Sequence, residues 1–192
     1  MNIGLFGGSF NPIHIGHAII ANHIVQFSGI DQLWFMVAPQ NPLKAKNHEV
    51  SDSDRLRMVE MVSRRLDKAI TSAFEFGLPY PSYTINTIKA LQRKFPNDKF
   101  TLIIGADNWA TFDKWKAPDE IISLCDIMVY PRVGYPIVIP DAYKDKVTAV
   151  DAPIIEISST AIRQHLKCLD NMAFYLPDDV YQYILQHKLY VK

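Results

Sequence analysis

Two kinds of hydrophobic pattern alternate along this chain. Short runs of consecutive apolar residues predict strands, and longer segments with an apolar residue every three or four positions predict helices. The predicted strands are 3–6, 32–38, 69–76, 100–104, 127–130 and 154–157, and the predicted helices are 16–27, a segment capped by Ser51 or Ser53, 83–95, a segment from Ser159, and 177–186. This alternation indicates an α/β fold: a doubly wound parallel sheet with helices on both faces and a small C-terminal helical part.

The segments between these elements indicate where a ligand is expected. In such a sheet, ligands bind at the carboxyl ends of the strands, and Gly7, Asp107 and Arg132 each stand just past an apolar run. The range 39–50 carries proline, asparagine and lysine and is predicted to be a surface loop. No linker, repeat or low-complexity tract divides the 192 residues, so we expect a single domain spanning 1–192.

The composition argues against several classes of protein. Lysine plus arginine and aspartate plus glutamate both number 20, so the formal net charge is zero, whereas a nucleic-acid binder usually carries a basic surplus. No apolar stretch reaches the roughly 18 residues of a membrane span, and no secretory leader is recognisable. Cys125 and Cys168 lack metal or redox spacing and are expected to be reduced, buried thiols. We therefore expect a cytoplasmic protein that binds neither membrane nor nucleic acid; a homo-oligomer stays open.

The most informative motif lies between the first predicted strand and the first predicted helix. It opens with Gly7 and Gly8, which allow the backbone to approach a phosphate closely, and continues through Ser9 and Phe10, which are also expected to contact the substrate. His14 and His17 follow at the start of the helix, where unpaired N–H groups and a partial positive charge attract anions. Neither a Walker A tripeptide nor a G-x-G-x-x-G array is present. The motif predicts a nucleotide-phosphate site; the alternative is a strand-to-helix turn with incidental histidines.

A second motif opens the predicted helix after residue 157. Ser159 and Arg163 are four positions apart, which places a hydroxyl and a guanidinium on one helix face, suited to a polyanion. Taken alone, the segment is an ordinary serine-capped helix with a solvated arginine. Taken with His14 and His17, the run Ile-Ser-Ser-Thr-Ala-Ile-Arg resembles the nucleotidyltransferase superfamily, which has a Rossmann-like fold and transfers AMP from ATP to a phosphate or similar acceptor.

The resemblance implies a role for each residue of the two motifs. Ser158, Ser159 and Arg163 would hold the β- and γ-phosphates and stabilise the departing pyrophosphate, while His14 and His17 hold the phosphates of ATP. The acceptor phosphate attacks the α-phosphorus in line, so no protein nucleophile, general base or covalent intermediate is expected. Mg²⁺ bound with ATP would share the charge, and no metal site is assigned to the protein itself.

The middle of the chain carries the features that would select the acceptor. Ser82, Tyr83 and Thr84 begin a predicted helix whose amide donors could bind a carboxylate, and the indole of Trp115 could stack on a pyridinium ring. These segments are similar to those of bacterial nicotinate-nucleotide adenylyltransferases, which convert nicotinate mononucleotide and ATP to deamido-NAD and pyrophosphate in NAD biosynthesis. The likeness spans nearly the whole chain, including the tail at 176–184.

This similarity implies further contacts. Thr84 would meet the nicotinate carboxylate through its backbone N–H, Trp115 would stack on the pyridine, and Asp107 would hold a ribose. The remaining implied contacts are Lys44 and Arg132 on phosphates, with Ile104 and Gly105 beside the adenosine. Asp107 has the alternative role of a helix cap, and Lys44 that of a solvated loop lysine.

Other side chains are expected to be structural. Trp34 and His23 are assigned to the core, and Trp109 to the core or to a ligand wall. The arginines of the helix after Ser51 are expected to form its exposed face: Arg55, Arg57, Arg64 and Arg65. The remaining histidines have no cluster of partner residues around them in the sequence: His48, His165 and His187.

Three other functions fit the two motifs. A pantetheine-phosphate adenylyltransferase has no reason to carry Ser82, Tyr83 and Thr84 together with Trp115. A nicotinamide-mononucleotide adenylyltransferase differs only at the pyridine substituent, and a non-catalytic nucleotide-binding sensor has no need of groups placed for a transition state. Many relatives carry aspartate at the position of Asn86 and a different loop at 78–81, which leaves open which N–H meets the carboxylate.

Overall fold

Six parallel strands form the sheet at the centre of the described molecule. The computed structural model describes residues 1–39 and 50–191, so Lys44 lies outside the described residues. The strands are β1 (Asn2–Gly8), β2 (Gln32–Val37), β3 (Ala69–Ser72), β4 (Lys99–Gly105), β5 (Asp126–Tyr130) and β6 (Val147–Ala149). They lie in the order β3-β2-β1-β4-β5-β6 and every neighbouring pair is parallel. The predicted doubly wound parallel sheet is confirmed.

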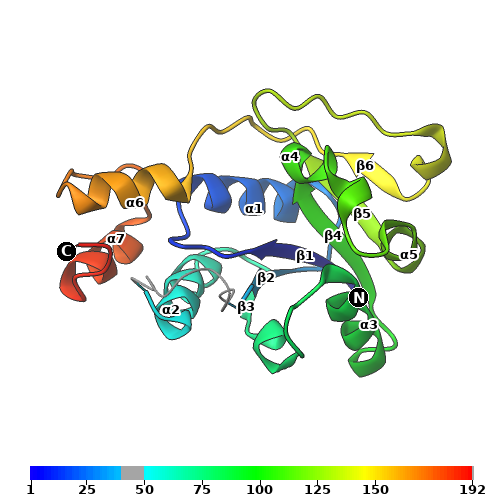
Figure 1. The fold of residues 1–192 in the computed structure, drawn as a ribbon, viewed down its shortest axis with the longest axis horizontal. Coiled ribbons are helices and arrows are strands. Elements are labelled where there is room, and N and C mark those ends of the chain that lie inside the picture. The colour runs from blue at the N-terminus through cyan, green and yellow to red at the C-terminus, as the bar shows by residue number, and fades with distance from the viewer. Residues whose placement is uncertain (40–49, 192) are drawn as a thin grey trace.

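Helices cover both faces of this sheet. They are α1 (Ile15–Phe27), α2 (Asp52–Ser63), α3 (Thr84–Lys94), α4 (Ala106–Trp109), α5 (Pro118–Leu124), α6 (Ser159–Lys167) and α7 (Asp178–Gln186). Short 3₁₀ segments occupy Phe74–Gly77, Phe112–Lys114 and Asp141–Tyr143. Figure 1 shows α1 and α3 on opposite sides of the sheet, and α6 and α7 at one end of the molecule as the C-terminal helical part.

The strand side chains divide between two cores, because successive residues of a strand point to opposite faces. In β2, Leu33, Phe35 and Val37 belong to the core that includes residues of α1 and α2. Trp34 and Met36, which alternate with them, belong to the other core, with residues of α3 and α5. The central strands are therefore buried on both faces, as their continuous apolar runs predict.

Two predicted strands differ from the structure. The run 69–76 pairs with β2 only over Ala69–Ser72, and its remainder forms the 3₁₀ segment Phe74–Gly77. The run 154–157 forms no strand, and Val147–Ala149 pairs with β5 instead. β6, and not the later segment, takes the hydrogen-bonding edge of β5. Two isoleucines of the later segment, Ile155 and Ile157, line cavities rather than the sheet.

Two expectations about single residues are wrong. Arg55 is completely buried, although Arg57 of α2, with Arg64 and Arg65 just past its end, is exposed as predicted. The start of α2 packs against the loop after β1, so the side chain at 55 lies between the two. Cys168 is exposed at the end of α6, whereas Cys125 is buried and burial raises the pKa of its thiol to about 12. Only Cys125 behaves as the small apolar core residue predicted for both.

The strand order reverses between β1 and β4. From β1 the sheet continues through β2 towards one edge, and from β4 through β5 towards the other. Connections leave such a pair on opposite faces, which opens a crevice at the carboxyl ends of the two strands. Gly8 ends β1 and Gly105 ends β4, so the first sequence motif lies at this crevice.

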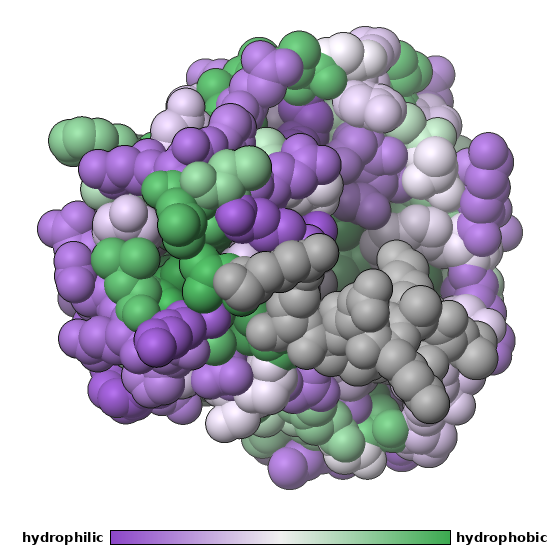
Figure 2. Space-filling model, turned by 60° about the vertical axis from the view of Figure 1, so that its left-hand side comes forward, coloured by the Kyte–Doolittle hydropathy of each residue, from purple (hydrophilic) through white to green (hydrophobic). Residues whose placement is uncertain are grey.

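The C-terminal end of the molecule has a mixed surface. Figure 2, with that end brought forward, shows a patch of hydrophobic residues among hydrophilic ones. Leu169, Phe174 and Leu185 are exposed apolar side chains of this part of the chain. Within residues 1–39 and 50–191, no helix has the length and apolar character that crossing a membrane requires.

Candidate active site

His14 and His17 are fixed against each other at the start of α1. His14 is the N-cap residue: its Nδ1 accepts the His17 backbone N–H at 3.4 Å, and the Nδ1 of His17 accepts the His14 N–H at 3.2 Å. The two rings stack with their centroids 3.7 Å apart. Because each Nδ1 accepts a hydrogen bond, each neutral ring carries its proton on Nε2. Both imidazoles are therefore held as Nε2–H donors.

The surroundings of both rings favour the uncharged form. Burial, with the nearby Arg132 charge, lowers the pKa of His14 from 6.5 to about 4. Burial lowers the pKa of His17 well below 6.5, and the charges of His14 and Arg132 lower it further. At neutral pH both side chains are thus neutral donors beside a fixed guanidinium. This environment suits an anion that brings its own negative charge.

These donors line a small cavity of about 180 Å³, which we call the histidine cavity. His14 and His17 contribute from α1, Arg132 from just past β5, and Ser158 and Ser159 from the start of α6. The two sequence motifs therefore meet across one cavity, although about 140 residues separate them. This meeting supplies hydroxyl, imidazole and guanidinium donors with a net positive character.

A larger cavity of about 770 Å³ adjoins the histidine cavity and shares Arg132 and Ser158 with it; we call it the wide cavity. Its walls include Asp107 on one side and the segment around Met172 on the other. Asp107 forms an ion pair with Arg132 at 3.7 Å, and its buried Oδ1 has no hydrogen-bond donor among the described residues. A buried carboxylate oxygen without a donor suits a ligand hydroxyl.

A third cavity of about 210 Å³ lies at the ends of β1 and β4 and is called the strand-end cavity. The strand ends supply Gly7, Gly8, Ile104 and Gly105, and the start of α3 supplies Ser82 and Thr84. Half-buried Trp115 forms part of its wall and packs against Phe112, with ring centroids 5.2 Å apart. Tyr130 lines both this cavity and the histidine cavity, so the two adjoin.

The structure places some predicted residues elsewhere. Ser159 Oγ donates to the Pro12 carbonyl at 2.9 Å, and a guanidinium nitrogen of Arg163 donates to the Asn11 carbonyl at 2.7 Å. Ser159 also lines the histidine cavity, whereas Arg163 lines none of the three cavities. The motif at Ser159 and Arg163 thus holds the backbone of the loop that precedes His14. Through Ser159 it also lines the cavity that His14 and His17 line.

Five more predicted residues have unexpected surroundings. Ile104 and Gly105, expected beside the adenosine, line the strand-end cavity with Trp115. Tyr83 is the residue before α3; its ring is 42% exposed and lies 4.5 Å from the Lys116 ammonium, outside the three cavities. Ser9 and Phe10 also lie outside them: Ser9 offers its carbonyl to Arg55, and Phe10 is buried with its ring 5.1 Å from that of His17.

Other residues lining the cavities carried little signal in the sequence. Glu75 lies in the strand-end cavity, and burial raises the pKa of its carboxyl although Thr87 donates to it at 2.9 Å. A single glutamate within an apolar run was the available clue, because carboxylates are seldom buried without a partner. His165 lines the wide cavity and pairs with Asp170 at 2.7 Å, a contact that the sequence does not reveal.

Comparisons with known proteins agree with this geometry. Residues 5–165 match the cytidylyltransferase-like family. A protein of Flavobacterium johnsoniae, named a probable nicotinate-nucleotide adenylyltransferase, is 44% identical over 193 residues that cover 100% of both chains. A protein with the same name from Bacteroides thetaiotaomicron is 43% identical over 187 residues, covering 97% of this chain and 92% of its own.

Solved structures share the fold at lower identity. The Plasmodium falciparum nicotinic acid mononucleotide adenylyltransferase complexed with NaAD has a TM-score of 0.81 at 18% identity, with 98% of this chain and 97% of that chain covered. The same enzyme complexed with APC gives 0.79 with 98% and 96% covered. The fold rests on these structures, and the family rests on the sequence matches. The chain therefore belongs to the cytidylyltransferase-like family and, within it, to the nicotinate-nucleotide adenylyltransferases.

Proposed function

We propose that this chain transfers AMP from ATP to nicotinate mononucleotide, forming deamido-NAD and pyrophosphate in NAD biosynthesis. The observation that carries the proposal is the junction of the histidine and strand-end cavities at Tyr130. One side offers donors for phosphates, and the other offers a helix start and an indole for a flat ring. Relatives that carry this name match the chain from end to end, including the Flavobacterium protein at 44% identity.

The chemistry needs placement and charge stabilisation rather than a protein nucleophile. A phosphate oxygen of the acceptor attacks the α-phosphorus of ATP in line; the bond from this phosphorus to the bridging oxygen breaks, and pyrophosphate leaves with that oxygen. His14 and His17 would donate through Nε2–H to phosphate oxygens, and Arg132 and Ser159 would add charge and a hydroxyl. Ser158 would bind phosphate where the histidine and wide cavities meet.

The nucleoside of ATP fits the wide cavity best in chemistry and size. The Asp107 carboxylate, which lines this cavity beside Arg132, would accept hydrogen bonds from a ribose. Among the described residues, no group of three potential metal ligands occurs. We therefore expect Mg²⁺ to enter as part of the MgATP substrate, bound through phosphate oxygens and water, as this ion commonly is. Arg163 would act through the Asn11 carbonyl that it holds, and Lys44 stays a proposed phosphate contact.

The acceptor fits the strand-end cavity. Tyr83 is the N-cap residue of α3 and its carbonyl accepts the Asn86 N–H, so the N–H groups of Thr84 and Ile85 have no backbone partner within the helix. They would bind the nicotinate carboxylate, with Ser82 beside it, while Trp115 stacks on the ring. Gly7 leaves room for the nucleotide because a side chain there would enter open space, whereas side chains at Gly8 and Gly105, which also line the cavity, would meet Phe10 and Asp107. We place the protein, as one domain, in the cytoplasm.

The test is release of pyrophosphate by the purified chain with MgATP and a panel of acceptors. We expect release only with nicotinate mononucleotide, together with one equivalent of deamido-NAD detected by mass spectrometry. Release with 4′-phosphopantetheine would identify the rival transferase instead. Tight binding of ATP without release for any acceptor would identify a sensor and refute the proposed reaction.

A further inference from the structure

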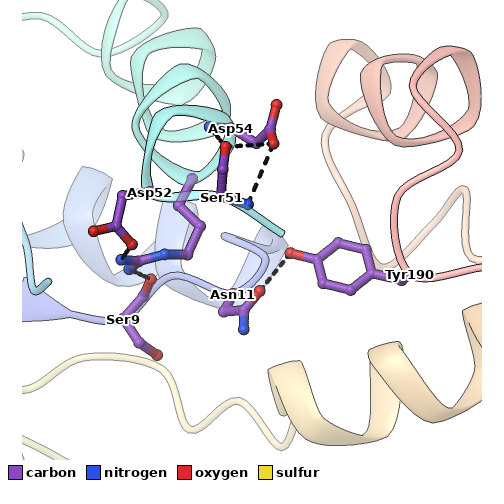
Figure 3. A network of polar contacts seen from close by, with 7 residues as sticks. Ser9, Asn11, Ser51, Asp52, Asp54 and Tyr190 are labelled. Carbon is purple, nitrogen blue, oxygen red and sulfur yellow. Dashed lines mark hydrogen bonds and ion pairs between the residues drawn. The ribbon is translucent and has the colours of Figure 1, made fainter. Parts of the chain in front are cut away.

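Side chains from distant elements hold the loop between β1 and α1. The Ser9 carbonyl accepts from Arg55 of α2, the Asn11 carbonyl from Arg163 of α6, and the Pro12 carbonyl from Ser159. The Asn11 side chain accepts in turn from the Tyr190 hydroxyl at 2.6 Å. Figure 3 shows the guanidinium that joins Asp52 to Ser9 on one side of the loop, and Tyr190 reaching Asn11 from the other. The loop that leads to His14 is therefore held along most of its length.

Arg55 is an unusual member of this network. Its side chain is completely buried, one terminal nitrogen donates to the Ser9 carbonyl and the other to Asp52 Oδ1 at 2.6 Å. Its Nε has no acceptor among the described residues. Burial of a guanidinium carries a desolvation penalty that one ion pair seldom exceeds, so such a pair is weak evidence for stability. A contribution to the geometry of the loop accounts for it better.

The bond to Ser9 fixes the direction of a peptide plane. The cis peptide bonds among the described residues do not include Ser9–Phe10, so the Ser9 carbonyl and the Phe10 N–H point in opposite directions. With the carbonyl held by Arg55, this N–H points away from α2. Among the described residues it meets no hydrogen-bond acceptor.

The same residue has a backbone that needs support. Phe10 has φ = +45°, a left-handed conformation that is uncommon and strained for a bulky side chain. Its ring packs against Phe6, with centroids 5.9 Å apart, and against the ring of His17. The arrangement around Phe10 thus sets both a free N–H donor and one wall of the His17 imidazole. Arg55 holds this arrangement from the carbonyl side.

We propose that Arg55 is a positioning residue for adenylyl transfer, which holds the Ser9–Phe10 peptide and, through the Phe10 ring, keeps the His17 ring in the right geometry to meet the ATP phosphates. This inference rests on the proposed function, and it adds a residue that touches neither substrate. It predicts that loss of Arg55 affects the phosphate side of the site and leaves the strand-end cavity unchanged.

The test compares Arg55→Met with the matched control Arg57→Met. Arg55→Met removes the donors but keeps an apolar stem, and a buried ion pair replaced by an apolar side chain is often tolerated. Its former partner Asp52 is 38% exposed and can be solvated. Arg57 lies on the same helix, 47% exposed, and pairs only with Glu60 among the described residues. Arg55→Lys, which keeps the charge but lacks the planar fork, is the second variant.

The measurements are kcat, the KM for each substrate, and the calorimetric Kd for α,β-methylene-ATP with Mg²⁺ and, separately, for nicotinate mononucleotide. We expect Arg55→Met to lower kcat by roughly ten- to a hundredfold, as a displacement of about 1 Å can. The analogue Kd should rise several-fold, with the Kd for nicotinate mononucleotide within twofold of wild type. The kcat and the analogue Kd of Arg55→Lys should lie between those of Arg55→Met and the wild type, and Arg57→Met should match the wild type.

Wild-type kcat and analogue Kd in Arg55→Met would overturn the inference. So would equal weakening of both ligands, since that pattern indicates a general structural role. If Arg55→Met does not fold, Arg55→Lys decides by the same two criteria. If the wild type releases no pyrophosphate, the proposed function fails, and the analogue Kd still tests the inference: a change confined to the analogue supports it, and an unchanged Kd refutes it.

Discussion

The histidine cavity and the strand-end cavity adjoin at Tyr130 but recognise their ligands by different means. The first is lined by side chains that carry the chemistry themselves: His14, His17 and Ser159, with Arg132 as a fixed charge. The second is lined by glycines, an indole and the start of a helix, together with the carboxyl of Glu75. In the proposed function, phosphate recognition therefore depends on the identity of side chains, and acceptor recognition on backbone donors together with the Trp115 ring. The first can be found in a sequence far more readily than the second.

The largest loss of activity is expected at His17. His17→Ala removes an Nε2–H donor from the histidine cavity, and loss of one donor that acts in the transition state lowers kcat by about 10²- to 10³-fold. The helix cap that His17 shares with His14 should cost about 1 kcal/mol of unfolding free energy. Pyrophosphate release and thermal unfolding measure the two effects. His23→Ala, on the same helix, is the control and should keep both values; an inactive His17→Ala that is also unfolded would make the residue structural.

The two cavities should respond oppositely to pH. The pKa of His14 is about 4 in the folded protein and near 6.5 when unfolded, so the unfolded chain binds more protons and the unfolding free energy falls as the pH drops below 6.5. Between pH 7 and pH 5 the loss is about 2 kcal/mol. Glu75 has a raised pKa, so the folded state binds more protons and its contribution to stability is lost as pH rises from near 4.5.

Urea unfolding of the wild type, His14→Gln and Glu75→Gln at several pH values separates these effects. His14→Gln should be less sensitive to acid than the wild type. As the pH rises, ionisation of Glu75 lowers the unfolding free energy of the wild type. The unfolding free energy of Glu75→Gln should therefore fall less over the same pH range. Identical pH profiles for all three proteins would show that neither cavity holds a perturbed group.

A smaller effect is expected at Trp115. Trp115→Ala removes the ring wall of the strand-end cavity and should raise the KM for nicotinate mononucleotide roughly 5- to 30-fold, since stacking on a cationic ring is worth about 1–2 kcal/mol. The KM for ATP should not change. Trp109→Ala provides the control, because Trp109 lines a separate cavity and its indole N–H donates to the Val138 carbonyl. An unchanged acceptor KM in Trp115→Ala would rule out stacking.

The smallest effect tests the backbone donor. Thr84 is the first residue of α3, a position that tolerates proline, and Tyr83 before it is already extended at φ −83°, ψ 139°. Thr84→Pro therefore removes one N–H without breaking the helix. The preference for the nicotinate over the nicotinamide nucleotide should fall about five- to tenfold, and Thr84→Ser should keep it. If Thr84→Pro and Thr84→Ser show the same preference, the carboxylate is bound by another donor.

The sequence predicted the elements of the fold correctly where the pattern of buried residues is regular. Continuous apolar runs at 100–104 and 127–130 gave the correct strands, because a strand buried on both faces needs no alternation. The run 154–157 is also rich in isoleucine but forms no strand, because Val147–Ala149 takes the edge of β5, and pairing depends on the rest of the sheet. The local pattern of apolar residues does not show which of two segments will pair with a given strand edge.

The site shows the same limit. The spacing of Ser159 and Arg163 predicted a shared helix face, but not that the loop carbonyls at Asn11 and Pro12 lie opposite it. Arg55 carried a usable signal, since positions 55, 58, 59 and 62 share the buried face of α2. A charged residue among the apolar residues of one helix face indicates a buried side chain that has a polar partner. Tyr190, close to the chain end, carried no comparable signal.

The most direct test of the account is the ratio of kcat/KM for nicotinate mononucleotide to that for nicotinamide mononucleotide, measured as pyrophosphate release with MgATP on the wild-type chain. Helix-start donors that face the pyridine substituent predict a ratio well above ten in favour of the carboxylate. A ratio near one, or one that favours the amide, would contradict the assignment of the strand-end cavity to nicotinate.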